Sequence, residues 1–488
     1  MKHTSILKIV SSLALLIALL PPTLVQTGCA NIVPPSGGPR DSLPPRLVNM
    51  RPGDSTRNFT GKRIVAEFDE FVQIDNIQEN LLVSPTPKIP PFVESKLRTV
   101  TITIKDTLEP NTTYSIDFGN ALKDINEGNI YKNFTYLFST GPALDSMRIS
   151  GRVIIAESGK TDSTLIVMLH TSADDSAVIK DKPRYVARVQ ADGSFNFYNL
   201  PSDTFHLYAL KDEGGQRRYL SKSQLFAFAD APVQTSVTPE PVTLYAYVEP
   251  EPDTSKPKTP AAGKTGPGRI RGGADKKNAE AENRLRVETN LASNELDLLS
   301  NLELRFSTPL KTFDSSKLRF TTEQFEPITN YRITRDTSNK VFTLVHAWTP
   351  NTAYNLILDS TFAEDTAGRK PTQIDTLAFR TKKTSEYGLV RLRIMNIDLG
   401  RNPVLQFVQS DQVKYSHPMN SREFNAPLFQ PGEYDLRILY DENKNGIWDA
   451  GEFFGKHRQP EKVQPISRKL TVKANWDNIV DITLENGK

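Results

Sequence analysis

Short runs in which apolar and polar residues alternate recur along most of the chain. Residues 64–68, 100–104, 114–118 and 136–138 are clear examples, and Pro, Gly, Asn or Asp stands near the borders of most such runs. Alternation with a period of two between turn residues is typical of strands in β-sandwiches. Amphipathic helical patterns are scarce, and the best candidate, residues 279–286, is short and polar. The pattern therefore predicts an all-β protein.

Comparison of the chain with itself reveals a duplication. The sequence PNTTY at residues 110–114 returns as PNTAY at residues 350–354, and DINEG at residues 124–128 is echoed by DTAG at residues 365–368. The order and spacing of such matches agree along about 90 residues, as expected of an internal repeat. At 488 residues the chain is long enough for several domains.

The first copy has four features with a known counterpart: Phe68-Asp69-Glu70 at the end of a strand, the Pro-Asn-Thr-x-Tyr turn, the Asp-x-Asn-x-Gly turn, and a closing Phe-Ser-Thr-Gly at residues 138–141. Together they resemble the bacterial Ig-like domain first described in S-layer proteins and frequent in Bacteroidetes lipoproteins. The resemblance covers residues 46–143 and, in a diverged form, residues 284–383.

The resemblance implies that its marked residues are structural. Pro110 and Asn111 would set a turn, Tyr114 would bury its ring beside the core, and Gly128 would supply a positive φ.

A second duplicated pattern follows each Ig-like copy. Residues 205–212 alternate as a strand, and residues 434–441 repeat that alternation. With residues 149–153 opening the earlier copy, the pattern is similar to a transthyretin-like or carboxypeptidase-regulatory-like β-sandwich. The similarity covers residues 144–248 and, more loosely, residues 384–488. Such sandwiches carry no catalytic centre, so the resemblance implies no peptidase. We expect two units, each an Ig-like domain followed by a regulatory-like sandwich.

The amino-terminal residues 1–28 predict an export signal, because Lys2 and Lys8 precede an apolar run, residues 9–20, that is too short to span a bilayer. The single cysteine, Cys29, follows Gln26-Thr27-Gly28, and this arrangement resembles a bacterial lipobox. The resemblance implies cleavage before Cys29 and a lipid on its sulfur, which would tether the chain to a membrane. An ordinary secretory signal with an incidental cysteine is the alternative.

Residues 29–45 predict a flexible tether rich in proline and small residues, and residues 249–283 predict a disordered linker rich in Pro, Gly and Lys. Contact of this basic linker with anionic lipid or glycan is an alternative to simple solvation. Ala30 is not the aspartate associated with inner-membrane retention, so we expect the outer membrane. Residues 30–34 contain no acidic cluster of the kind that would resemble a Bacteroidetes surface-export signal. This absence favours the periplasmic side over surface exposure.

Net charge and cysteine content exclude several classes of protein. Lys and Arg number 60 against 57 Asp and Glu, a net charge of only +3. This balance gives no support to a protein that coats nucleic acid, so we expect no nucleic-acid partner. A single cysteine excludes an intramolecular disulfide and a thiolate zinc site.

One segment carries candidate metal chemistry. Residues 441–452 fit the twelve-residue calcium-loop template, in which oxygen ligands alternate along a tight loop around a glycine at position six. The predicted Ca²⁺ ligands are the side chains or, for Ile447, the backbone carbonyl of Asp441, Asn443, Asn445, Ile447, Asp449 and Glu452. Because a strand precedes the loop, we expect a calcium loop on a β-domain rather than an EF-hand. A metal-free Asn-Gly turn is the alternative.

No catalytic residues are predicted. The six histidines are scattered, without a His-x-x-x-His pair, and the chain has no nucleophile elbow or phosphate loop. We therefore expect a non-catalytic cell-envelope lipoprotein, a membrane-tethered scaffold or binding protein of several β-sandwiches. Its partners would be the membrane, through lipidated Cys29, and an envelope protein or a glycan. The alternative is a glycan-binding accessory protein of a polysaccharide-uptake system.

Overall fold

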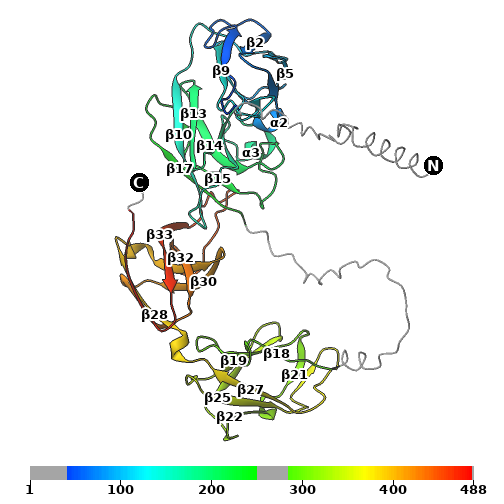
Figure 1. The fold of residues 1–488 in the computed structure, drawn as a ribbon, viewed down its shortest axis with the longest axis vertical. Coiled ribbons are helices and arrows are strands. Elements are labelled where there is room, and N and C mark those ends of the chain that lie inside the picture. The colour runs from blue at the N-terminus through cyan, green and yellow to red at the C-terminus, as the bar shows by residue number, and fades with distance from the viewer. Residues whose placement is uncertain (1–40, 250–283, 486–488) are drawn as a thin grey trace, which may run out of the picture.

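A computed structural model describes residues 41–249 and 284–485, and these residues form four β-sandwiches. Strands dominate the described chain, which confirms the predicted all-β class with tandem sandwiches. In Figure 1 the sandwiches follow one another in space in the order first, second, fourth, third. The predicted signal peptide, Cys29, most of the tether and nearly all of the linker lie outside the described residues.

The first sandwich contains a sheet of order β1-β2-β6-β5, a sheet of order β4-β7-β9 and the pair β3-β8. Its elements are β1 (Leu47–Arg51), β2 (Arg63–Phe68), β3 (Val72–Ile74), α2 (Ile77–Asn80), β4 (Leu82–Ser84), β5 (Phe92–Lys96), β6 (Thr99–Thr103), β7 (Thr113–Asp117), β8 (Leu122–Asp124) and β9 (Thr135–Ser139). Along β2, Ile64, Ala66 and Phe68 are buried while the residues between them are exposed or half-buried. The alternation in the sequence thus places every second side chain in the core.

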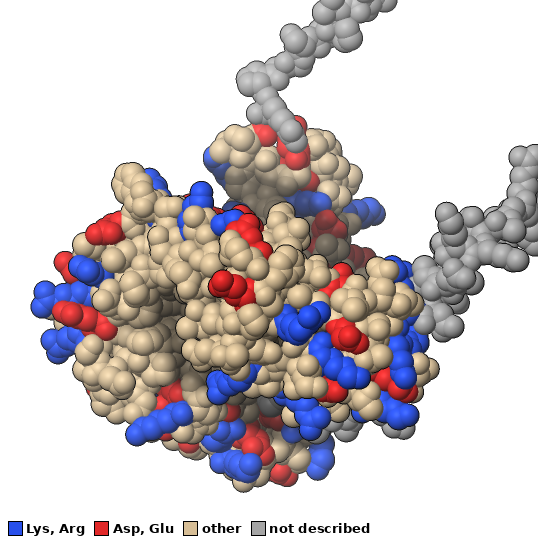
Figure 2. All heavy atoms as spheres, turned by 90° about the horizontal axis from the view of Figure 1, so that it is seen from below, with Lys and Arg blue, Asp and Glu red and all other residues tan. Residues whose placement is uncertain are grey.

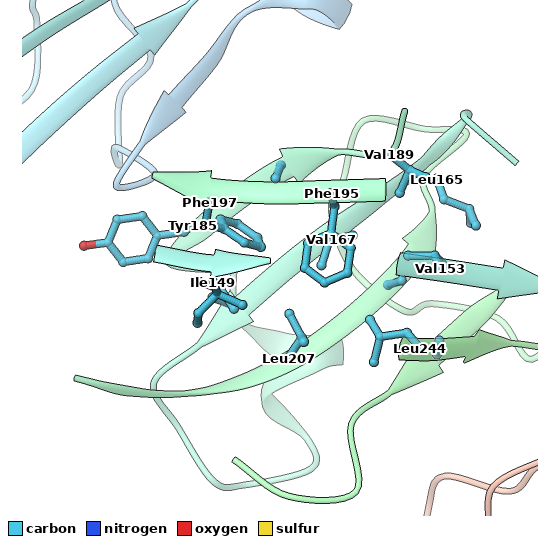
Figure 3. Packing of buried hydrophobic residues seen from close by; sticks show 14 of the residues in the cluster. Ile149, Val153, Leu165, Val167, Tyr185, Val189, Phe195, Phe197, Leu207 and Leu244 are labelled. Atoms are coloured by element: carbon cyan, nitrogen blue, oxygen red, sulfur yellow. The ribbon is translucent and has the colours of Figure 1, made fainter. Parts of the chain in front are cut away.

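The second sandwich packs a sheet of order β13-β10-β17 against a sheet of order β12-β11-β14-β15, with β16 also paired to β14. Its elements are β10 (Met147–Ile155), β11 (Leu165–His170), α3 (Ala177–Lys180), β12 (Tyr185–Arg188), β13 (Ser194–Leu200), β14 (Thr204–Lys211), β15 (Phe226–Phe228), β16 (Val233–Gln234) and β17 (Val242–Ala246). Figure 3 shows side chains of its core, among them Val153, Val167 and Phe195, between strands of the two sheets.

The third sandwich repeats the strand order of the first. Its sheets β18-β20-β24-β23 and β22-β25-β27-β19 and its pair β21-β26 correspond to β1-β2-β6-β5, β4-β7-β9 and β3-β8, with β19 added. Its elements are β18 (Glu288–Thr289), β19 (Glu295–Leu296), β20 (Leu302–Arg305), β21 (Leu310–Phe313), η1 (Ser315–Lys317), β22 (Leu318–Thr322), β23 (Arg332–Arg335), β24 (Val341–Val345), β25 (Ala353–Leu358), β26 (Ala363–Asp365) and β27 (Asp375–Thr381).

The fourth sandwich repeats the second in the same way. Its sheets β31-β28-β34 and β30-β29-β32-β33 correspond to β13-β10-β17 and β12-β11-β14-β15, and β34 runs parallel to β28 as β17 does to β10. Its elements are η2 (Thr384–Glu386), β28 (Gly388–Met395), η3 (Leu399–Arg401), β29 (Pro403–Gln409), β30 (Gln412–Pro418), β31 (Glu423–Phe429), β32 (Gly432–Tyr440), β33 (Lys462–Val472) and β34 (Asp477–Thr483).

Helices contribute little to the described chain. Both of its α-helices, α2 and α3, are four residues long, and none of its helices is long and apolar enough to cross a membrane. Of the candidate helix at residues 279–286, only residues 284–286 are described, and they are not helical. The predicted domain boundaries stay predictions, which limited proteolysis with mass determination of the fragments would test.

Candidate functional site

The predicted calcium loop, residues 441–452, begins where β32 ends. Asp441 is only 2% exposed, and its carboxylate accepts hydrogen bonds from the backbone N–H groups of Asn445 (3.2 Å) and Gly446 (2.7 Å). Gly446 has a φ of 80°, a left-handed conformation that favours glycine. These bonds fold the loop back onto its first residue.

Four of the predicted ligands gather inside this fold. The side-chain amides of Asn443 and Asn445 donate to the carboxylate of Asp449 at 2.6 and 2.7 Å, next to the buried Asp441. The side chain of Ile447 is 64% exposed, as suits a residue expected to contribute only its carbonyl. The structure thus brings together positions one, three, five and nine of the template.

The last predicted ligand is placed differently. The carboxylate of Glu452 accepts a hydrogen bond from Lys456 Nζ at 2.9 Å, and its backbone pairs with Arg458. The described residues contain no cluster of three or more His, Cys, Asp or Glu side chains arranged to hold a metal ion. The predicted calcium site therefore stays a prediction.

Glu461 is the carboxylate that closes the loop in this structure. It is 5% exposed and accepts backbone hydrogen bonds from Glu442 (2.8 Å) and Asp449 (3.0 Å). Burial raises the pKa of Glu461, and the charges of Asp441 and Asp449 raise it further, against the lowering effect of those hydrogen bonds. The sequence did not point to Glu461, because it lies beyond the twelve-residue template and reaches the loop only through the intervening turn.

The segment that follows the loop docks onto the second sandwich. We call residues 451–465 the clasp segment, and Tyr208, Tyr219, Phe226, Phe228 and Tyr247 the aromatic socket. Phe453 is 1% exposed, and its ring centroid lies 5.7 Å from Tyr208, 5.2 Å from Phe226 and 5.1 Å from Phe228. The next ring, Phe454, stacks on Tyr219 at 6.0 Å. Aromatic pairs at such distances contribute beyond their burial.

Close backbone approach accompanies this ring packing. A Cβ atom on Gly451 would lie only 2.6 Å from the Tyr247 ring, so only glycine fits there without movement. The backbone N–H of Phe453 donates to the carboxylate of Glu249 at 3.3 Å, and the backbone N–H of Val463 donates to the carbonyl of Ala156 at 3.2 Å. The clasp segment therefore contacts the second sandwich through backbone as well as side chains.

Polar side chains surround the socket. His457 Nε2 lies 2.6 Å from the carboxylate of Asp175, and Gln459 donates to Asp230 at 2.7 Å and to the carbonyl of Phe228 at 3.0 Å. Lys462 Nζ sits 4.4 Å from the centroid of the Tyr245 ring, a cation–π distance. An aromatic centre with a polar rim is the usual anatomy of a specific protein interface. No motif in the sequence indicated this contact.

Comparison with known proteins adds one family match. Residues 41–140 match the model of the bacterial Ig-like domain, and the curated proteins include no match to this chain. Solved structures similar to the chain include the TIE protein of Bacillus anthracis, at 11% identity and a TM-score of 0.16, covering 93% of this chain and 76% of that one.

Two further solved structures are similar at the same level. The major pilin subunit BcpA of Bacillus cereus has 10% identity and a TM-score of 0.15, covering 70% of this chain and all of the other. The amino-terminal part of the bacterial S-layer protein SbsC has 17% identity and a TM-score of 0.15, with 38% and 40% covered. TM-scores this low mean that the whole chains do not superpose. The family match is confined to residues 41–140, which include the first of the tandem β-sandwiches and are similar to a bacterial Ig-like domain.

Proposed function

We propose that this chain is a non-catalytic scaffold of the bacterial cell envelope. The observation that supports it is the aromatic socket, where the clasp segment of the fourth sandwich buries Phe453 in the second sandwich. Burying one Phe side chain contributes about 2–3 kcal/mol, and its aromatic neighbours add to this. A contact of this kind fixes the spacing of two domains, which is the property that a scaffold needs.

Surface charge is consistent with this role. Figure 2 shows Lys and Arg interspersed with Asp and Glu over the visible face, without a large area of one sign. Such a surface does not attract nucleic acid by bulk charge. The match of residues 41–140 to the bacterial Ig-like domain also supports a scaffold role.

We propose further that a lipid on Cys29 anchors the scaffold to the outer membrane, on its periplasmic side. The support is the sequence around Cys29, with Gln26-Thr27-Gly28 before it and no acidic cluster after it. Such an anchor would leave only residues 30–40 between the membrane surface and the first described residue, Asp41.

Membrane fractionation and protease shaving of intact cells test this proposal. Wild-type protein should sediment with the outer membrane and resist added protease until that membrane is broken, whereas Cys29→Ala should leave the membrane fraction. A membrane pool that persists in Cys29→Ala contradicts the lipid anchor. Digestion on intact cells contradicts the periplasmic side and favours adhesion or glycan capture.

We propose Ca²⁺ as the ion of the loop at residues 441–452. The carboxylates of Asp441 and Asp449 belong to this loop, and rotation of the Asn443 and Asn445 side chains, whose amide nitrogens face Asp449, would turn their oxygens toward an ion. Oxygen atoms are the ligands that Ca²⁺ prefers. The final carboxylate would come from Glu452, released from Lys456, or from Glu461. The ion would hold the loop, and through it the clasp segment, in one conformation.

Calorimetric titration of the full chain with Ca²⁺ tests this site. Asp441→Asn should weaken binding about ten-fold or more, whereas Asp477→Asn on the exposed start of β34 should not change it. Comparing Glu452→Gln with Glu461→Gln identifies the final ligand, because only the substitution of the true ligand should weaken Ca²⁺ binding as much as Asp441→Asn does. Absence of Ca²⁺ binding by wild-type protein at millimolar concentration contradicts the proposal.

A further inference from the structure

The two units of the chain differ in what covers one edge of their Ig-like sandwich. In the first unit, β4 and β12, which end their sheets, lie against each other across the domain boundary. The backbone N–H of Thr86 donates to the carbonyl of Arg184 at 2.8 Å. Two ion pairs complete this contact, Arg184 with Glu109 at 2.6 Å and Arg188 with Asp117. An end strand of the second sandwich therefore lies on this edge of the first sandwich.

In the described chain, no strand of another sandwich lies on the matching edge of the third sandwich. A segment of the same sandwich lies there instead, because the N–H of Thr322 donates to the carbonyl of Glu326 (3.0 Å) and the N–H of Ile328 donates to the carbonyl of Phe320 (2.9 Å). Strand β22 corresponds to β4, and the strand that corresponds to β12 is β30 of the fourth sandwich, but the two have no comparable packing. The third sandwich instead meets the fourth elsewhere, through hydrogen bonds to Asp297 from Tyr387 (2.9 Å) and Gln430 (2.6 Å). The ion-pairing residue Asp117 of the first unit is replaced at the repeat position by Ile357.

A groove of about 660 Å³ lies beside this edge and is lined by residues of the end strands β22 and β23 and of the segment between them. Half-buried apolar side chains line it, including Tyr331, Ile333 and Ile357. The lining contains two arginines, Arg319 and Arg332, and no carboxylate. Neither arginine belongs to the ion pairs found within 4 Å in residues 41–249 and 284–485.

One aromatic residue at the rim is held in an unfavourable conformation. Phe325 is 61% exposed and has a φ of 63°, in the left-handed region that bulky side chains rarely adopt. The turn that holds it is closed by a hydrogen bond from its N–H to the carbonyl of Thr322 at 3.1 Å. Strain of this kind concentrates at binding and active sites, where the surrounding structure maintains it.

The chain's own β30 does not suit this groove. It carries Lys414 and no carboxylate, so it would bring like charge toward Arg319 and Arg332. Charge complementarity instead calls for carboxylates on the incoming segment. The open edge of β23 calls for an extended backbone, because end strands pair with added strands.

We propose that this groove binds an extended, acidic segment of a partner protein. Apolar side chains of the segment would lie along Tyr331, Ile333 and Phe325, and its carboxylates would pair with Arg319 and Arg332. The inference goes beyond the scaffold role, because it states where a partner attaches, and it does not depend on the lipid anchor.

Fluorescence polarisation on the full chain in detergent tests the proposal. The probe is a labelled ten-residue peptide of alternating Glu and Val, blocked at both ends, with the corresponding Lys and Val peptide as its control. The acidic peptide should bind at least about ten-fold more tightly than the basic one. The double change Arg319→Glu with Arg332→Glu should weaken its binding about ten-fold or more.

A matched pair of charge reversals controls for net charge. Arg391→Glu with Arg393→Glu, at exposed positions of β28, changes the charge equally and should leave binding within about two-fold of wild type. Phe325→Gly removes the ring and the strain together, so it should weaken binding while thermal stability is kept or raised.

Three results would overturn the proposal. They are equal binding of the acidic and basic peptides, no weakening by the Arg319 and Arg332 reversals, and binding of an oligoglucuronate but not of the acidic peptide. The last result would assign the groove to an anionic glycan. None of these three results depends on how the Cys29→Ala protein fractionates. Failure of the groove proposal is therefore distinct from failure of the scaffold proposal.

Discussion

At the scale of single residues, the duplicated Ig-like motif builds the same turn twice. Asn111 and Asn351 both adopt a φ of 51°, which asparagine tolerates better than most residues. The hydroxyl of Tyr114 accepts from the backbone N–H of Glu109 at 2.9 Å, and Tyr354 accepts from Thr349 at 3.3 Å. The turn implied at Asn111 is thus confirmed, and so is the buried ring of Tyr114, which is 5% exposed in the core of the first sandwich.

Buried histidine makes the second sandwich sensitive to acid. His170 on β11 is 3% exposed, and its Nε2 has no hydrogen-bond partner among the described residues. Burial is the main cause that lowers the pKa of His170 to about 4; the charge of Asp181 opposes this shift, and the register partner His206 contributes to it. An unfolded histidine has a pKa near 6.5, so the unfolded chain binds the proton first.

We predict that the free energy of unfolding of the second sandwich falls as pH decreases from about 6.5 to about 4. One pKa unit corresponds to about 1.4 kcal/mol, so the loss approaches about 3 kcal/mol. Below about pH 4 this contribution changes no further. Hydrogen exchange of the β11 amides between pH 7 and 4 measures it. His170→Phe should flatten the dependence, whereas His417→Phe at an exposed site should not; equal slopes in wild type and His170→Phe contradict the prediction.

At the scale of elements, one aspartate ties the pair β21-β26 to its surroundings. Asp365, the last residue of β26, is fully buried and accepts hydrogen bonds from Thr308 Oγ1 (2.7 Å) and from Arg369 Nε (2.8 Å). Burial alone would raise the pKa of Asp365, but these and backbone hydrogen bonds outweigh it and lower the pKa to about 2. Asp124 holds the corresponding turn in the first sandwich, where Gly128 has a φ of 80°, as expected.

We predict that Asp365→Asn destabilises the third sandwich by about 3 kcal/mol, because Arg369 loses its buried partner. The folded pKa lies below the unfolded value, so the wild-type stabilisation is present above about pH 4 and is lost as pH falls toward 2. Urea unfolding followed by hydrogen exchange at β26 measures both effects. Asp314→Asn at an exposed position is the control, and equal stability of the two variants would contradict the role given to Asp365.

Most of the strands could be predicted from the sequence, because their alternation is local. The runs at residues 64–68 and 434–441 coincide closely with β2 and β32, and the two strand orders repeat as the duplication indicated. Glu461 could not be predicted, since it reaches the calcium loop through a turn outside the template. The clasp segment and the groove also escaped prediction, because they depend on how separate sandwiches meet or fail to meet.

At the scale of the whole molecule, the order in space differs from the order in the chain. The fourth sandwich, not the third, lies next to the second, and the clasp segment provides the contact (Figure 1). Lys160 of the second sandwich and Asp411 of the fourth add an exposed ion pair at 2.6 Å. Exposed pairs contribute little, so the aromatic socket carries most of the energy of this contact.

We predict that Phe453→Ala separates the second and fourth sandwiches. Replacing a buried Phe by Ala costs about 3–5 kcal/mol, which is a large share of what one interdomain contact supplies. Small-angle X-ray scattering should then show a larger radius of gyration and a broader distance distribution, while circular dichroism keeps the β-sheet signal. Phe71→Ala, at a 45% exposed position of the first sandwich, should leave the scattering unchanged. Identical scattering curves for wild type and Phe453→Ala would mean that other contacts hold the two sandwiches together, and that the socket does not set the shape of the scaffold.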